Sequence, residues 1–150
     1  MNRHLMQNLI DSGRLRARFT DIERIRSLVK AAETNLIVVK DIKLNENSAT
    51  LVFREIYESI RQLGDAKWWL LGYEPLDHDI SLDILKEIDI TNRTKMNFLQ
   101  RFKRIRHDAN YRGFMVSVSQ AEELIDFWST CGQEILDKLK KEISKGIKTG

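Results

Sequence analysis

The sequence predicts an all-α protein, an up-and-down antiparallel bundle of four major helices with additional short helices. The chain of 150 residues contains one proline, Pro75, and seven glycines, so few positions interrupt long helices. Apolar residues recur at steps of three and four along most of the chain, as on the buried face of an amphipathic helix. The segments between these periodic stretches are short, which favours antiparallel packing of neighbouring helices.

The first third of the sequence predicts two helices of different length. Residues 2–11 form a short helix that ends at Ser12 and Gly13, because glycine commonly follows the last turn of a helix. Thr20 and Glu23 have the spacing of a capping box, in which each side chain bonds a backbone amide of the first turn. The helix that they begin is expected to end near residue 42.

A second long helix follows, and its sequence contains two unusual features. Ser48 is expected to cap this helix and Gly72 to end it. Gly64 within the helix costs about 1 kcal/mol relative to alanine, so its presence predicts a close approach of another element. Trp68 and Trp69 differ by about 100° around the helix, so only one of them is expected in the core. The other is expected to face a neighbouring helix, a dimer partner or a nucleobase.

The second half of the chain predicts three more helices. Asp77 begins a short one, and Thr91 or Asn92 begins the next, which Gly113 ends. A second capping box opens a final helix over residues 119–145.

Residues 98–113 form the most informative of these helices. Its core face is expected to consist of Phe98, Phe102, Ile105 and Ala109. Arg104, His107 and Tyr111 lie roughly opposite, and Arg106 and Asn110 line one flank. Guanidinium and imidazole groups gathered in this way are suited to holding a phosphate. Basic residues are also common in the last turn of a helix, where they interact with the negative end of its dipole.

Length and composition predict one domain spanning residues 1–150, with residues 1–19 as an N-terminal extension. Hydrophobic residues make up 42% of the chain, which fits a soluble globular protein and does not support a disordered one. The longest apolar runs, at residues 36–39 and 68–71, are far shorter than the roughly 20 residues that span a bilayer. Residues 1–5 lack the apolar segment of a secretion signal. We therefore expect a cytoplasmic protein that does not associate with a membrane.

The sequence predicts neither a metal site nor a cofactor. Cys131 is the single cysteine, so the chain can form no internal disulfide and no thiolate metal site. It lies on an apolar helical stripe, where a small buried residue is expected. The histidines His4, His78 and His107 are far apart and lack a metal-ligand spacing such as His-Glu-x-x-His.

Charge is unevenly distributed, although the net charge is only +3. Basic residues are concentrated in residues 14–18, 101–112 and 138–148, and acidic residues in residues 77–89. The basic stretches can attract nucleic acid electrostatically. A lysine-rich chain end is also typical of a solvated helix, so this pattern permits a polyanionic ligand without requiring one.

Three short segments form a set of motifs. Residues 56–61 have the sequence Ile-Tyr-Glu-Ser-Ile-Arg, and residues 72–78 have the sequence Gly-Tyr-Glu-Pro-Leu-Asp-His. Residues 106–111 have the sequence Arg-His-Asp-Ala-Asn-Tyr. In their order, spacing and helical setting, these segments resemble the signatures of HEPN domains (higher eukaryotes and prokaryotes nucleotide-binding). The resemblance covers about residues 48–145 and is of the prokaryotic or archaeal stand-alone type.

The resemblance implies a helical bundle that often forms a homodimer, with the second signature near a groove at the dimer interface. Many relatives are metal-independent RNases, commonly toxins of toxin–antitoxin pairs, and others are partners of minimal nucleotidyltransferases. Arg106 occupies the arginine position of the family, and His107 the polar position after it. Tyr111 stands where the family usually has histidine. A phenol with a pKa near 10 is poorly matched to proton transfer at neutral pH, so the RNase signature is weakened.

We therefore expect a HEPN-like module that binds a nucleotide or RNA phosphate as a homodimer, with a nucleotidyltransferase as a further partner. The expected ligand-binding residues are Arg104, Arg106, His107, Asn110, Arg112 and His78. His78 also has a structural alternative, because at a helix start it can hydrogen-bond within its own loop.

Two other functions remain open. One is a metal-independent endoribonuclease, in which Arg106 stabilises the pentavalent phosphate, His107 transfers a proton and Tyr111 positions the substrate. The other is a purely protein-interacting subunit, such as the partner of a nucleotidyltransferase. The sequence leaves undecided whether the protein is an enzyme, which ligand it binds, which surface dimerises and what residues 1–19 do.

Overall fold

The computed structural model describes the backbone of residues 1–149 and the side chains of residues 1–146, and the fold is all-α as predicted. Its α-helices are α1 (Arg3–Asp11), α2 (Ile22–Val39), α3 (Ala49–Leu70), α4 (Asp79–Leu85), α5 (Phe98–Tyr111), α6 (Val118–Phe127) and α7 (Gln133–Thr149). A 3-10 helix, η1 (Arg93–Asn97), precedes α5, and a π-helix, η2 (Trp128–Gly132), joins α6 to α7. Two short strands, β1 (Leu15–Ala17) and β2 (Tyr73–Pro75), pair antiparallel. Gly150, the last residue of the expected domain, and the Lys148 side chain of the basic tail lie outside the described residues.

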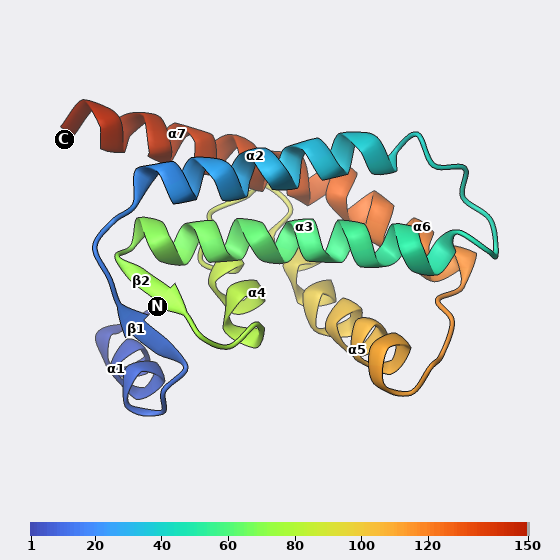
Figure 1. Ribbon diagram of the computed structural model, residues 1–150, viewed down its shortest axis with the longest axis horizontal. Helices are drawn as coiled ribbons and strands as arrows, with labels where there is room; N and C mark the ends of the chain where they lie inside the picture. Colours follow the sequence, from blue (N-terminus) through green and yellow to red (C-terminus); the bar gives the residue numbers. More distant parts are fainter. Residues whose placement is uncertain (150) are drawn as a thin grey trace.

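Helix α3 runs through the middle of the molecule (Figure 1). Helices α2 and α7 lie along one side of it, and α4 and α5 lie on the other side. Helix α2 and the α6–α7 segment run in opposite directions on the first side, as in an up-and-down bundle. A site built from α3, α4 and α5 is therefore on the face of α3 away from α2.

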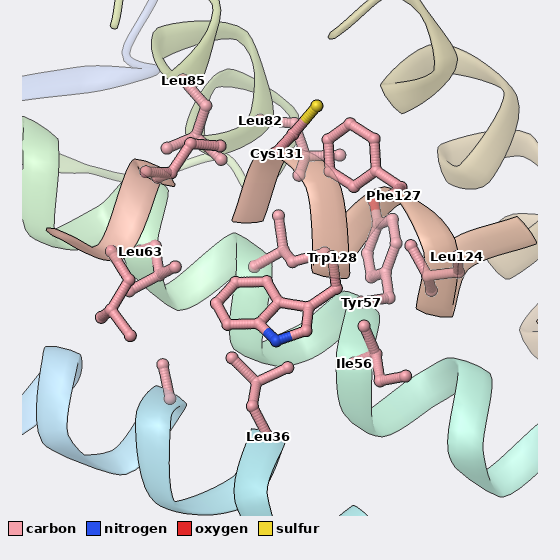
Figure 2. Packing of buried hydrophobic residues seen from close by; sticks show 14 of the residues in the cluster. Leu36, Ile56, Tyr57, Leu63, Leu82, Leu85, Leu124, Phe127, Trp128 and Cys131 are labelled. Atoms are coloured by element: carbon pink, nitrogen blue, oxygen red, sulfur yellow. The ribbon is translucent and has the colours of Figure 1, made fainter. Parts of the chain in front are cut away.

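The main core forms where α3 meets α2, α4 and the α6–η2 segment. Figure 2 shows side chains from these elements gathered around Trp128. The Phe102 and Phe127 rings meet edge to face with their centroids 5.5 Å apart, which joins α5 to α6. Cys131 is fully buried in this core, as predicted.

The adjacent residues Trp68 and Trp69 are 0% and 7% exposed, so the prediction that only one of them is a core residue was wrong, although Trp68 does pack against a neighbouring helix, α4. Trp69 belongs to the main core, whereas Trp68 packs in a second, smaller core. This small core contains Leu15 of β1 and residues of α4, and residues of α1 pack against it. The indole Nε1–H of Trp68 donates to the carbonyl oxygen of Ile80 at 3.0 Å. Residues 1–17 thus pack on the bundle and create the surface that buries the second tryptophan.

Glycine marks two features of α3 that were predicted. Gly72 has φ +90°, a conformation that side chains disfavour, and it ends the helix. Gly64 lies so close to α4 that an added Cβ would be 1.7 Å from the carbonyl oxygen of Ser81. Only a residue without a side chain allows this approach.

Of the two predicted helix caps near the start of the chain, one lies at a different residue and the other lacks its side-chain hydrogen bond. Asp21, not Thr20, caps α2, and its carboxylate accepts from the backbone N–H of Arg24 at 3.0 Å. A carboxylate also interacts more favourably than a hydroxyl with the positive end of the helix dipole. Ser48 occupies the N-cap position of α3 as predicted, but its hydroxyl donates to the carbonyl oxygen of Lys43 at 2.6 Å and bonds no amide of the first turn.

The final predicted helix differs in its start and its continuity. The capping box consists of Ser117 and Gln120 rather than of residues 119 and 122, so α6 begins at Val118. The helix is then interrupted by the π-turn η2. An added Cβ at Gly132 would lie 1.8 Å from a ring carbon of Trp128, so the indole packs directly on the glycine. A π-turn contains one residue more than an α-turn. The spacing of apolar residues at steps of three and four does not reveal it.

Helix α5 also begins later than expected. The chain passes through η1 before the α-helix starts at Phe98, rather than at Thr91 or Asn92. Phe98 is 48% exposed and lines an open pocket between α5 and α6, whereas Leu99 is buried. The predicted core position of Phe98 was therefore wrong, because α6 does not cover the first turn of α5.

None of the helices in residues 1–149 is both long and apolar enough to cross a membrane.

Candidate functional site

A cleft of about 420 Å³ lies between α3, α4 and α5. Helix α3 contributes a tyrosine and an arginine, the start of α4 contributes acidic and imidazole groups, and α5 contributes basic and aromatic groups. The lining residues are Tyr57, Arg61, Leu76, Asp77, His78, Asp79, Lys103, Arg106, His107 and Tyr111. Each of the three segments that carry the HEPN resemblance therefore supplies residues to one cleft.

Four of the predicted site residues line this cleft, namely His78, Arg106, His107 and Tyr111. The other three, Arg104, Asn110 and Arg112, do not line it. Arg112 instead pairs with Asp108 at 4.0 Å and packs over the ring of Phe114. A helical wheel separates the core face of α5 from its exposed face. It cannot indicate that residues 76–79, at the start of α4, face only the part of this surface that holds residues 103, 106 and 107.

Arg106 is held by an aromatic ring rather than by a carboxylate. Its guanidinium carbon lies 5.2 Å from the centroid of the Tyr57 ring, within the range of a cation–π interaction. Within the described part of the chain, the side chain of Arg106 forms no ion pair and no hydrogen bond. A cation–π contact leaves the N–H groups at the edge of the guanidinium available to an anion.

The Tyr57 hydroxyl is a hydrogen-bond donor in this cleft. Its side chain is only 6% exposed, and burial raises the pKa of the phenol to about 12, against the opposing charge of Arg106. The hydroxyl therefore keeps its proton at neutral pH. No residue among those described hydrogen-bonds to it, although it lines the cleft. A ligand oxygen in the cleft is a natural acceptor for this hydroxyl.

His107 and Tyr111 form a ring pair on α5. Their centroids are 4.7 Å apart with a tilt of 40°, as expected for aromatic side chains one helical turn apart. Tyr111 is 74% exposed, so this pair forms an accessible aromatic surface beside Arg106. Such a surface is suited to stacking a planar group of a ligand.

Arg61 forms the centre of an ionic network behind the cleft. It pairs with Glu58 and, at 2.9 Å, with Asp65 on the same face of α3. The hydrogen bond from Arg61 lowers the pKa of the Glu58 carboxyl, whereas burial raises the pKa of Asp65. Asp65 also accepts a hydrogen bond from the hydroxyl of Ser81 on α4, which ties the network to the second wall of the cleft.

Cations already neutralise the two carboxylates of the cleft. Asp77 pairs with Arg14 at 2.7 Å, and Asp79 with Lys103 at 3.4 Å. Burial of Asp77 favours its neutral form. Even so, the hydrogen bonds from the backbone of Asp79 and from Arg14 lower its pKa overall, so it remains charged. Of the cations that line the cleft, Arg106 is the one without a carboxylate partner in the described structure, and the cleft therefore favours an anion.

Sequence reasoning missed Tyr57, Arg61 and Lys103 as lining residues. One signal for Arg61 was present, because acidic residues stand three positions before it and four after it. It also missed the β1–β2 pair, which aligns Arg16 with Glu74 and brings Arg14 to Asp77. The N-terminal extension thus holds the loop that carries His78.

The lowered pKa of Glu74 predicts that the stability of the protein changes with pH in the acid range. Its carboxylate accepts hydrogen bonds from Arg16 at 2.6 Å and Arg18 at 3.1 Å, and the first of these is the main cause of its lowered pKa. A folded-state pKa below the unfolded value of 4.5 stabilises the protein above that pH. The contribution disappears as the pH falls from 4.5 through the folded-state pKa.

Glu74→Gln should therefore lower the melting temperature slightly at neutral pH, by no more than about 3 °C for such an exposed pair. The difference from the wild type should vanish in acid, as thermal unfolding at several pH values would show. Glu46→Gln, in an exposed loop, is the matched control. An acid response of Glu74→Gln equal to that of the wild type would contradict this account.

Within residues 1–149 no group of three or more His, Cys, Asp or Glu side chains is arranged to hold a metal ion. Comparisons of the chain with protein-family models, curated proteins and solved structures found no match. The chemistry of the cleft is therefore the basis for assigning a function.

Proposed function

We propose that this protein is a HEPN-like helical module that binds the phosphate group of a nucleotide or of RNA in the cleft between α3, α4 and α5. The observation that carries the proposal is the state of Arg106. Its guanidinium lies on the Tyr57 ring and has no carboxylate partner in the described structure, so it can form charge-assisted hydrogen bonds with a phosphate.

The groups around Arg106 also favour a phosphate. The protonated hydroxyl of Tyr57 and the ammonium of Lys103 are donors that line the same cleft. Phosphate oxygens only accept hydrogen bonds when the group is fully ionised, so a donor-rich cleft matches them. The aromatic pair of His107 and Tyr111 can stack on a nucleobase attached to that phosphate.

The resemblance to HEPN domains supports the same assignment. Residues 56–61, 72–78 and 106–111 are separated in the sequence, yet residues of all three line the cleft. Homodimer formation and a nucleotidyltransferase partner belong to this proposal through the resemblance alone.

Arg106→Ala tests the proposal. Hydrogen bonds to charged groups contribute about 1.5–3 kcal/mol, so this variant should lose roughly 10- to 100-fold in affinity. The probes are AMP and a short fluorescein-labelled single-stranded RNA, measured by calorimetry and by fluorescence anisotropy over a series of salt concentrations. The affinity of the wild type should fall as salt increases, because ion contacts are screened.

Arg104→Ala is the matched control, because Arg104 is an exposed arginine of the same helix that does not line the cleft. Its affinity should stay within about twofold of the wild type, the usual scale of an exposed substitution. The proposal is wrong if the wild type binds neither probe. Equal, salt-insensitive affinities of the wild type and Arg106→Ala would also reject it.

A further inference from the structure

We infer that His78 is a neutral imidazole with its proton fixed on Nε2, that Arg61 is the positioning residue that fixes it, and that His78 serves the cleft as a hydrogen-bond donor. The contact between Arg61 and His78 and the chemistry of a guanidinium determine the tautomer. The role as a donor to the bound anion rests on the proposed function, whereas the tautomer does not.

The contact leaves one assignment of the imidazole proton. Nη1 of Arg61 lies 2.9 Å from Nδ1 of His78. A guanidinium has only N–H donors and remains protonated in proteins, so it cannot accept a hydrogen bond. Nδ1 must therefore accept with its lone pair, and the proton of the neutral ring is on Nε2. A doubly protonated ring would direct an N–H group at a like-charged donor.

Arg61 cannot easily turn away from this contact. Its Nε donates to Glu58 at 3.1 Å, its Nη2 donates to the other oxygen of the same carboxylate, and its Nη1 also donates to Asp65 at 2.9 Å. The side chain is 13% exposed. Ser81 of α4 donates to the second oxygen of Asp65. Residues of both α3 and α4 therefore fix the orientation of the Arg61 N–H group that donates to His78.

His78 is held on its own side as well. It is the N-cap residue of α4, and the neighbouring Asp77 accepts from the backbone N–H of Asp79 at 2.9 Å. Asp77 also pairs with Arg14 of the N-terminal segment. No side chain or carbonyl in the described structure accepts a hydrogen bond from Nε2 of His78, and the residue lines the cleft. Its Nε2–H is therefore available to a ligand oxygen.

The two imidazoles of the cleft consequently have different chemistry. His78 can donate a hydrogen bond from Nε2, while the lone pair of its Nδ1 already accepts from Arg61. The imidazole of His107 contacts the Tyr111 ring, and neither of its nitrogens has a hydrogen-bond partner among the described residues. Both nitrogens of His107 therefore remain available to a ligand, whereas His78 offers only its Nε2–H.

Long-range ¹H–¹⁵N correlation spectra of the ¹⁵N-histidine-labelled protein near neutral pH test the tautomer directly. His78→Gln identifies the signals of His78 by their loss. We expect a protonated Nε2 and a bare Nδ1 in the wild type, without any ligand. Arg61→Met should convert this signature to the mixed tautomers of a solvated imidazole, provided that circular dichroism shows a folded protein. The wild-type spectrum decides the question if that variant does not fold.

Binding of AMP and of inorganic phosphate tests the donor role. His78→Ala should weaken both by about tenfold, the scale of one hydrogen bond to a charged group. His78→Gln should recover most of the affinity, because its amide keeps an N–H donor near the position of Nε2.

The possible failures differ from one another. A proton on Nδ1, or a doubly protonated ring near neutral pH, overturns the tautomer whatever the protein binds. Wild-type affinity in His78→Ala, together with weak binding by Arg106→Ala, overturns the donor role and leaves the proposed function standing. Wild-type affinity in both variants overturns the donor role and the proposed function together.

Discussion

Replacing Gly64 with alanine is expected to destabilise the protein by about 3 kcal/mol or more, at the upper end of the cost of overpacking a core. An alanine Cβ would lie 1.7 Å from the carbonyl oxygen of Ser81 and 2.5 Å from its carbonyl carbon. Both are backbone atoms, so no side-chain rotation relieves the clash and α4 must move away from α3. The loss is a large part of the roughly 5–15 kcal/mol that stabilises a typical domain.

Thermal unfolding measures this effect, and the melting temperature should fall by about 6–12 °C. Gly146→Ala is the matched control, because an added Cβ at this exposed helical position meets no atom within 4 Å. Alanine there should be neutral or slightly stabilising. If Gly64→Ala and Gly146→Ala have the same stability, then α4 does not approach α3 as described.

The same substitution should also weaken anion binding. Movement of α4 separates Ser81 from Asp65 and His78 from Arg61, so the network behind the cleft loses two of its links. Binding should be weaker even at a temperature where the variant remains folded.

Replacing Trp68 with alanine is expected to cost about 3–5 kcal/mol, the usual range for removing a large aromatic side chain from a core. Trp68 is fully buried, and its indole N–H has a partner in the carbonyl oxygen of Ile80. Its ring also meets Tyr73 edge to face at 6.2 Å, so it joins α3, β2 and α4. Without Trp68, the small core beneath the N-terminal segment loses its largest side chain.

Denaturant unfolding and limited proteolysis measure this loss. Trp68→Phe is the matched variant, because it keeps an aromatic ring and removes the N–H; it should be clearly more stable than Trp68→Ala. Protease should cut residues 1–19 of Trp68→Ala faster than those of the wild type. Equal stability of the two variants, with no change in proteolysis, would show that the small core contributes little.

Much of this fold was predictable because its signals are local. The periodic apolar residues of α2 and α3, the stop at Gly72 and the buried position of Cys131 all depend on neighbours within a few turns of helix. The β1–β2 pair was not predicted. Each of its strands has three residues, and it aligns Arg16 with Glu74, so nothing near either strand indicates the other.

The candidate site likewise contains residues that could be predicted from local sequence and residues that could not. The basic and aromatic residues of α5 were predicted from one helix, whereas the role of Arg61 depends on how closely α4 approaches α3. The expectation for Arg104 shows the limit of a helical wheel, which identifies the face turned from the core but not the neighbour that shares it. Whether the four predicted residues that line the cleft bind a ligand stays a prediction.

The adjacent tryptophans of α3 link the packing of the two cores. Because one indole enters each core, a rotation of the last turns of this helix would withdraw both at once. The N-terminal segment and the bundle therefore both pack against the same turn of α3, the former on Trp68 and the latter on Trp69. A substitution far from the cleft would then affect it indirectly, because it would rotate or stretch α3.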